Sequence, residues 1–191
     1  MMRTVRTASW FTLAACLCTA IATARQADPE EASILTDFTR RVQAYDALRW
    51  GVSAPIAACS FDPAEIRRAI DACGDAIREA RSSACLGDVF TADVAALFRR
   101  YIRESVEGDF QALLEMVYED EDREPLPAAS VNGRWPGEAL PTMPPRLLAR
   151  LPALPPGLQY RFVNRDLALW DSQADLIVDI IPDAIPPLTA P

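Results

Sequence analysis

Through the N-terminal part of the chain, apolar residues recur every three or four positions, with charged residues between them. This spacing places the apolar side chains on one face and is typical of amphipathic helices. Three such stretches follow Asp28, Asp62 and Thr91, and a shorter one follows Asp109. The pattern predicts four helices within residues 25–124, packed as a bundle.

The first two helices share a start signal, an Asp-Pro pair with a glutamate close behind it. Asp28 and Asp62 are suited to cap the helix N-terminus, and the proline after each fits the first helical position. Glu31 is expected to reach back to the start of its helix, as in a capping box. Gly74 lies inside the second helix, where glycine costs about 1 kcal/mol relative to alanine, so it predicts a close approach by another segment.

The pattern changes at an acidic run, residues 119–124, which a proline-rich connector follows over residues 125–157. Asn132-Gly133 predicts a tight turn, because both residue types tolerate a positive φ. Residues 144–151 predict a short helix with proline at its start. Apolar anchors at intervals predict that the connector lies across the core as a strap: Val131, Trp135, Leu140, Met143, Leu147 and Leu151.

The last segment, residues 158–191, contains three short apolar runs separated by polar turn residues, which predicts a compact antiparallel β-meander. One turn centred between Asn164 and Arg165, and a second over residues 171–174, give a register with four facing pairs: Phe162/Leu167, Tyr160/Leu169, Leu169/Leu176 and Leu167/Val178. This register collects apolar side chains on one face, which the helices are expected to cover.

The opposite face of the meander is predicted to be polar and is the expected place for a binding site. The candidate binding residues on it are Arg161, Trp170, Asp175 and Asp179. The last run, residues 174–181, also fits an amphipathic helix, although Pro182 and the density of β-branched residues favour a strand.

These patterns together predict an α+β fold built as one compact unit. It comprises a helical part over residues 25–124, the connector over residues 125–157, and a small three-stranded antiparallel meander over residues 158–191, packed on the helices.

Residues 1–24 have the features of an export signal. A basic start and an apolar core precede Ala22-Thr23-Ala24, which matches a small-residue cleavage site, so cleavage is expected before Arg25. A bacterial lipobox ending at Cys16 is the other interpretation, and it would leave the chain lipid-anchored. The sequence thus predicts an exported protein, periplasmic or extracellular, with no later segment of roughly 18 apolar residues to span a membrane.

All 19 cationic side chains are arginine, and the chain has no lysine and no histidine. Catalysis by a Ser-His-Asp or Cys-His pair, imidazole metal sites, Schiff bases and phosphate loops with lysine are therefore excluded. The net charge is −8, and it becomes more negative when the two arginines of the first 24 residues are removed. This charge argues against nucleic acid and anionic membranes as partners.

Three cysteines follow the export signal: Cys59, Cys73 and Cys85. An odd number in an oxidising compartment suggests one disulfide and one remaining thiol. Cys73 lies on the apolar stripe of the second helix, while Cys59 and Cys85 lie beyond its two ends. A bond from Cys73 to either of the others needs only one loop to fold back, whereas a Cys59–Cys85 bond needs both, so all three pairings stay open with the first two favoured.

Carboxylates supply the remaining candidate chemistry. The acidic run 119–124 lacks the spacing and the turn glycine of a Ca²⁺ loop, and is expected to be a solvated helix end. The aspartates of the meander are expected to form surface ion pairs, although two of them converging in a cleft would suit acid–base hydrolysis. No metal site and no cofactor are predicted. Trp50, Trp135 and Trp170 are expected to make core or strap contacts.

Two parts of the sequence resemble known protein families. Most of the chain after the signal resembles an uncharacterised family of exported bacterial proteins, through FTRRVQAYDALR, DPAEIRRAI, GDVFTADVAALFRR, VNGRWP, PTMPPRLLARLPALPP and RDLALWDSQADLIVDIIPDAIP. This resemblance implies export and a shared fold. Separately, LPPGLQYRFVNRDLALWDSQADLIVDII is similar to the strand module of the small periplasmic nickel/cobalt-homeostasis family (RcnB-like), which implies a meander and a periplasmic setting.

The sequence is compatible with three functions. The first is an exported, non-enzymatic protein that acts through protein or envelope contacts, with another envelope protein as a candidate partner. The second is a metal-linked stress or homeostasis protein, on the RcnB-like resemblance. The third is a carboxylate-dependent hydrolase.

Overall fold

The computed structural model describes residues 28–52, 62–106, 113, 126–136 and 143–186. Its elements in chain order are α1 (Pro29–Val52), α2 (Pro63–Ala80), α3 (Ala92–Ser105), α5 (Pro145–Leu148), β1 (Leu158–Val163), β2 (Asp166–Asp171) and β3 (Leu176–Ile181). The export signal, Cys16, Cys59 and the acidic run lie outside the described residues. Of the fourth predicted helix only Leu113 is described, helical and fully buried.

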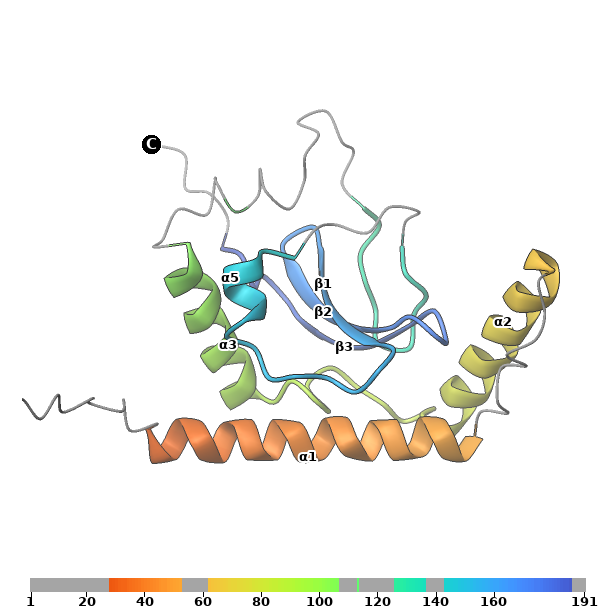
Figure 1. Ribbon diagram of the computed structural model, residues 1–191, viewed down its shortest axis with the longest axis horizontal. Helices are drawn as coiled ribbons and strands as arrows, with labels where there is room; N and C mark the ends of the chain where they lie inside the picture. Colours follow the sequence, from red (N-terminus) through yellow and green to blue (C-terminus); the bar gives the residue numbers. More distant parts are fainter. Residues whose placement is uncertain (1–27, 53–61, 107–112, 114–125, 137–142, 187–191) are drawn as a thin grey trace, which may run out of the picture.

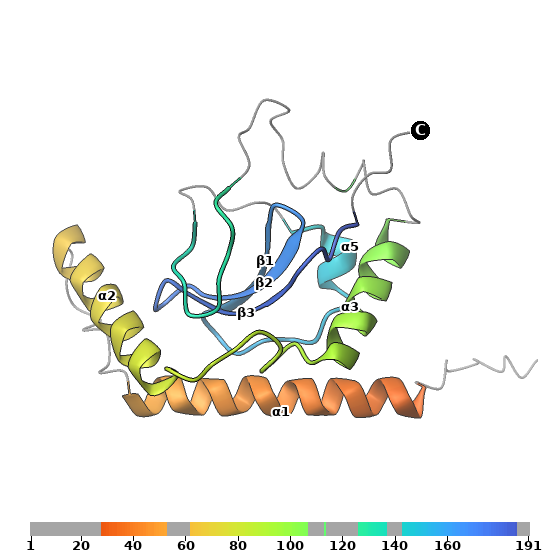
Figure 2. The ribbon, with the colours of Figure 1, turned by 180° about the vertical axis from the view of Figure 1, so that it is seen from behind.

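The helices frame the sheet. α1 runs along one side of the molecule, and α2 and α3 rise from its opposite ends with the sheet between them (Figure 1). The view from behind shows the same frame, with the short α5 beside α3 (Figure 2). The sheet has the order β1-β2-β3 with antiparallel pairs, so β1 and β3 are its edge strands. The predicted α+β class and the antiparallel meander are confirmed, and the last apolar run is a strand.

The helices and one face of the sheet share the main core. Phe38 of α1, Phe98 of α3 and Tyr160 of β1 meet there with ring centroids between 5.2 and 6.3 Å apart. Leu167 and Leu169 of β2 are fully buried on the same face. Because burying one such side chain contributes about 1.5–3 kcal/mol, this core holds the frame onto the sheet.

Both predicted helix starts are confirmed. Asp28 and Asp62 each accept a hydrogen bond from the backbone amide two residues on, at 3.1 and 2.9 Å. The capping box at Glu31 is wrong, because its carboxylate instead accepts from Arg100 Nη2 and Tyr101 Oη of α3, each at 2.5 Å. Glu31 therefore ties α1 to α3. Among the described helices, none is both long and apolar enough for a membrane span.

The first hairpin has the predicted register. Phe162 pairs with Leu167 and Tyr160 with Leu169, as the alternation of apolar residues required. Asn164 takes a positive φ of 54° in the turn, a conformation that asparagine tolerates better than most residues.

The second hairpin does not have the predicted register. Leu169 pairs with Asp179 and Trp170 with Ile177, so Val178 is an extra residue in β3 and forms a bulge. The predicted pairs with Leu176 and Val178 are therefore wrong. The bulge exchanges the faces of the residues after it, which turns Asp179 toward the helices and Ile180 away from them.

The connector covers the other face of the sheet. Trp135 packs there with Ile177 and Ile180 in a second, smaller core, which is why this face is not the exposed polar surface expected from the sequence. The amide of Asn132 donates to Ile177 O, and the amide of Ile177 donates to Gly133 O, both at 2.8 Å. The predicted strap is confirmed for these residues. In the predicted turn, Asn132 has a positive φ of 62°, but Gly133 does not.

The close approach predicted at Gly74 is confirmed. A Cβ added at this position would lie 2.6 Å from the backbone oxygen of Ala174, in the turn between β2 and β3. α2 therefore packs against that turn through a position where any side chain beyond hydrogen would force the two segments apart.

Candidate functional site

The four candidate residues predicted on the meander do not form one site. Arg161 and Trp170 lie on the face that the connector partly covers, where Gln159 pairs directly with Trp170. Trp170 packs on Trp135 with ring centroids 5.4 Å apart, as expected for strap contacts. Trp50, in contrast, is 61% exposed at the end of α1, so its predicted core contact is wrong.

Asp179 lies on the opposite face and is fully buried. Its Oδ1 accepts from the amides of Gly87 at 3.0 Å and of Ile180 at 2.8 Å, and its Oδ2 accepts from the amides of Val89 and Phe90, both at 2.7 Å. Successive amides that converge on one carboxylate form an anion-binding nest. The role of Asp179 is therefore to hold the loop before α3 against β3.

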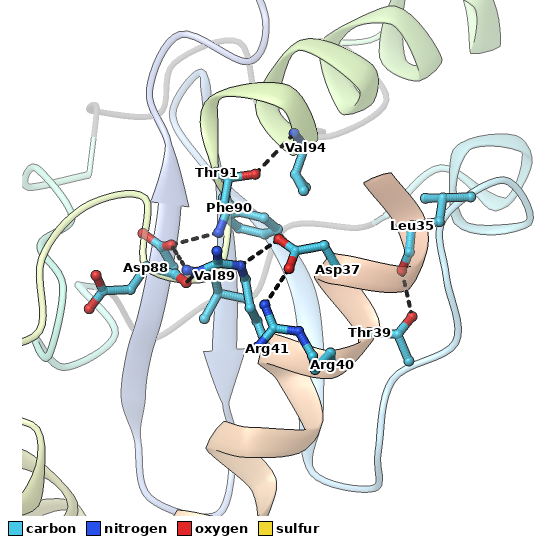
Figure 3. Close-up of polar contacts among 11 residues, drawn as sticks. Leu35, Asp37, Thr39, Arg40, Arg41, Asp88, Val89, Phe90, Thr91 and Val94 are labelled. Atoms are coloured by element: carbon cyan, nitrogen blue, oxygen red, sulfur yellow. Dashed lines mark hydrogen bonds and ion pairs between the residues drawn. The ribbon is translucent and has the colours of Figure 1, made fainter. Parts of the chain in front are cut away.

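The loop that Asp179 holds is also fixed from α1. Arg41 Nη1 donates to the backbone oxygen of Asp88 at 2.8 Å, and Arg41 Nε donates to Asp37 at 2.6 Å (Figure 3). Thr91, at the end of this loop, caps α3 by accepting from the amide of Val94 at 3.4 Å. The loop is thus bound on one side by a carboxylate and on the other by a guanidinium.

Asp175 lies in the turn between β2 and β3, whereas Arg161 lies in β1, the edge strand on the other side of the sheet. It takes a positive φ of 47° and accepts from the amide of Trp135 at 3.4 Å. Arg134 Nη1 lies 3.7 Å from its second oxygen. Asp175 therefore anchors the connector to the sheet.

A buried polar network joins α1 to the end of β2, and the sequence did not predict it. The carboxylate of Asp171 is fully buried and accepts from Tyr45 Oη at 2.8 Å, from Arg49 Nη1 at 3.3 Å and from the amide of Gln173 at 2.9 Å. Arg49 is 2% exposed and also donates to the backbone oxygen of Pro156 at 2.9 Å. Burial, together with the charge of Asp171, raises the pKa of Tyr45 far above its usual value.

Gly157 is required beside this network. It has a φ of 89°, and a Cβ there would lie 2.9 Å from both Arg49 Nη1 and the side chain of Gln173. The turn before β1 consequently depends on a residue without a side chain.

A groove of about 570 Å³ borders β1. One wall consists of the strand itself, from Leu158 to Arg161, and the other of α5 and the segment after it. The residues that line the groove are Met143, Leu148, Leu151, Pro152, Ala153, Leu154, Leu158, Gln159, Tyr160 and Arg161. Its volume lies within the range of about 300–1,000 Å³ that is typical of small-molecule sites.

Arg161 is the cationic residue of the groove. Its Nη2 donates to Gln159 Oε1 at 2.5 Å, whereas its Nε is buried and has no hydrogen-bond partner within the described part of the chain. Among the described residues, no carboxylate lies within ion-pair distance of it, although many arginines of this chain have one. Partial burial lowers the pKa of Arg161, because the charged guanidinium has lost part of its water. The groove thus combines an apolar surface with one guanidinium that has no counter-charge among the described residues.

The cysteines give no reactive pair in the described part of the chain. Cys73 is buried on α2 and Cys85 is exposed, and the two are not bonded to each other. The pairings with Cys59 lie outside the described residues. Cys85 Sγ donates to Asp88 Oδ1 at 3.1 Å, and this hydrogen bond raises the pKa of the thiol. Within the described ranges, no three Cys, Asp or Glu side chains lie close enough to hold a metal ion.

No family model, no curated protein and no solved structure matches the chain. The two resemblances drawn from the sequence therefore stay predictions.

Proposed function

We propose that the protein is an exported, non-enzymatic binding protein that acts through contacts with a component of the cell envelope. The observation that supports this function most is the environment of Arg161. Its partly buried guanidinium lies in the wall of an apolar groove, and no described carboxylate forms an ion pair with it. A charge in such a place costs free energy unless a partner neutralises it. The export signal over residues 1–24, cleaved before Arg25, is part of the proposal.

The geometry of the meander carboxylates supports the binding role better than a hydrolytic one. Asp171 and Asp179 are fully buried, and their oxygens accept hydrogen bonds from the protein itself. Asp166 accepts from the amide of Asp183, and Asp183 pairs with Arg165. No observation on the described residues favours the metal-linked role or the hydrolase.

A charge placed in the groove is expected to abolish binding of the envelope component. Leu148 lines the groove and is 50% exposed, so Leu148→Asp changes the surface of the groove with little loss of core packing. An extract of the cell envelope is expected to raise the melting temperature of the exported protein by several degrees and to leave that of Leu148→Asp unchanged. At roughly 100 times its Kd, a ligand adds about 2.7 kcal/mol to stability.

The control for this measurement is Leu86→Asp. Leu86 is a leucine of similar exposure, 54%, that does not line the groove. This variant should keep the full shift in melting temperature. An equal shift in Leu148→Asp, or no shift in the unchanged protein, would show that the groove is not the site of contact.

A further inference from the structure

We propose that the groove beside β1 binds a small amphiphile that has one apolar chain and one carboxylate headgroup, with the headgroup on Arg161. This inference rests on the proposed function, because it names the ligand class of the same groove. It commits to a free single-chain molecule rather than to a membrane surface or a protein segment.

The lining of the groove fits an apolar chain. Leu148, Leu151, Leu154 and Leu158 contribute to it, with Met143 at one side. Leu148 is half exposed, at 50%. Covering such surface with a ligand chain is favourable by about 25 cal/mol for each Å² removed from water, and methionine and leucine walls adapt to an unbranched chain.

The polar end of the groove fits a carboxylate. A guanidinium presents its donors in a planar fork that matches the two oxygens of a carboxylate, and such charge-assisted bonds are stronger than neutral ones. In Arg161, Nη2 is held by Gln159 Oε1, and no described carboxylate pairs with the guanidinium, so its charge is left for a ligand. The contact with Gln159 holds the guanidinium in place, so a ligand carboxylate would meet an oriented partner.

The walls of the groove fit a small molecule better than an added β-strand. The amide of Leu158, at the start of β1, already donates to Pro155 O at 3.1 Å. This amide is therefore not available to pair with an added strand. Tyr160 Oη donates to Pro152 O at 3.0 Å and so ties the strand to the opposite wall. A peptide that extends the sheet needs a continuous open edge, whereas an alkyl chain needs only the apolar space between the walls.

The charge of the whole chain also favours a small ligand. The protein has a net charge of −8, so a long acidic polymer would be repelled over most of the surface. A molecule with a single negative charge meets only the local field of Arg161. Arg165, in the turn between β1 and β2, pairs with Asp183, which follows β3. Arg165 is therefore a matched control cation outside the groove.

The test is titration calorimetry of the exported protein with four probes, used below the concentration at which they form micelles. The probes are dodecanoate, dodecanol, dodecyltrimethylammonium and acetate. Dodecanoate is expected to bind at least 10-fold more tightly than dodecanol, and neither the cationic amphiphile nor acetate should bind measurably. Arg161→Gln is expected to weaken dodecanoate binding by roughly 10- to 100-fold and to leave dodecanol binding unchanged.

Two further variants separate the charge of Arg161 from its shape and from the general charge of the protein. Arg161→Lys keeps the charge but loses the fork, so it should retain part of the affinity for dodecanoate. Arg165→Gln should bind dodecanoate as the unchanged protein does. Circular dichroism of each variant shows whether it is folded.

The inference is overturned if dodecanoate does not bind, if dodecanol binds equally well, or if folded Arg161→Gln and Arg161→Lys both keep the full affinity. Binding of an extended acidic peptide without binding of dodecanoate would assign the groove to a protein partner and would also overturn it. If the envelope extract still stabilises the protein but not Leu148→Asp while dodecanoate fails, only the ligand class is wrong. If the extract fails as well, the proposed function falls with it.

Discussion

Replacing Asp179 with alanine is expected to lower the free energy of unfolding by at least about 4 kcal/mol, which is a large part of the stability of an ordinary domain. The carboxylate is fully buried and accepts from four backbone amides, at Gly87, Val89, Phe90 and Ile180. Each amide left without a partner costs about 1–3 kcal/mol. Urea denaturation followed by circular dichroism measures the change.

The control for this result is Asp75→Ala. Asp75 pairs with Arg78 on α2, and its side chain is 74% exposed. Because exposed ion pairs contribute little, the expected loss is below about 1 kcal/mol. Asp179→Asn keeps the shape of the side chain but turns an N–H group toward amide donors, so it should fall between the two. A loss of only 1 kcal/mol in Asp179→Ala would contradict the nest.

Replacing Asp171 with asparagine is expected to cost about 3 kcal/mol, the lower end of the range for removing one partner of a buried ion pair, because Arg49 keeps its ion pair with Asp46. The change removes the fully buried negative charge that faces Arg49, which is 2% exposed and keeps Asp46 as its remaining ion-pair partner. Tyr45→Phe removes the hydroxyl that donates to the same carboxylate and should cost about 1.5–3 kcal/mol. The same urea denaturation measures both variants.

The double variant Tyr45→Phe/Asp171→Asn measures whether Tyr45 and Asp171 stabilise the fold together. Tyr45 and Asp171 share a hydrogen bond of 2.8 Å, so the two losses should not add. The free energy of unfolding lost in the double variant is expected to be smaller than the sum of the two single losses by at least about 0.5 kcal/mol. Additive losses would contradict a coupled network, and a small loss in Asp171→Asn would contradict the burial of its charge.

The parts of the fold that follow local rules were predictable from the sequence. The Asp-Pro helix starts are set by the first turn alone, and the register of the first hairpin follows from a short turn between two alternating runs. The short helix α5 begins at Pro145, as its proline suggested. In each case the residues that decide the structure are neighbours in the chain.

The second hairpin was not predictable in the same way. The alternation of the last strand places Asp179 on the polar face, whereas the structure buries it. An aspartate normally belongs in water, and its burial here depends on the amides of Val89 and Phe90, which are remote in the sequence. The bulge at Val178 turns Asp179 toward the core, and the alternation of apolar and polar residues in the sequence does not indicate this bulge. The connector added a second error, because its cover over Ile177 and Ile180 makes an apolar core on the face that was expected to be polar.

Of the four predicted binding residues, only Arg161 lines the groove. Arg161 was predictable because it lies on the opposite face from the core residues of β1, whereas Trp170, predicted with it, packs on Trp135 and does not line the groove. The groove itself needs the segment from Leu148 to Leu154 beside the edge of β1, and this is a long-range contact that spacing does not encode. The apolar anchors Leu147 and Leu151 indicated that the connector packs, but not which edge of the sheet it meets.

The most direct test of the binding groove is the change in amide chemical shifts of the exported protein during a titration with dodecanoate. Shifts are expected to concentrate in two segments that meet only in the folded protein, residues 148–154 and residues 158–161. The side-chain Nε–H of Arg161 should shift with them. Shifts confined to another part of the molecule, or no shifts at all, would contradict the account.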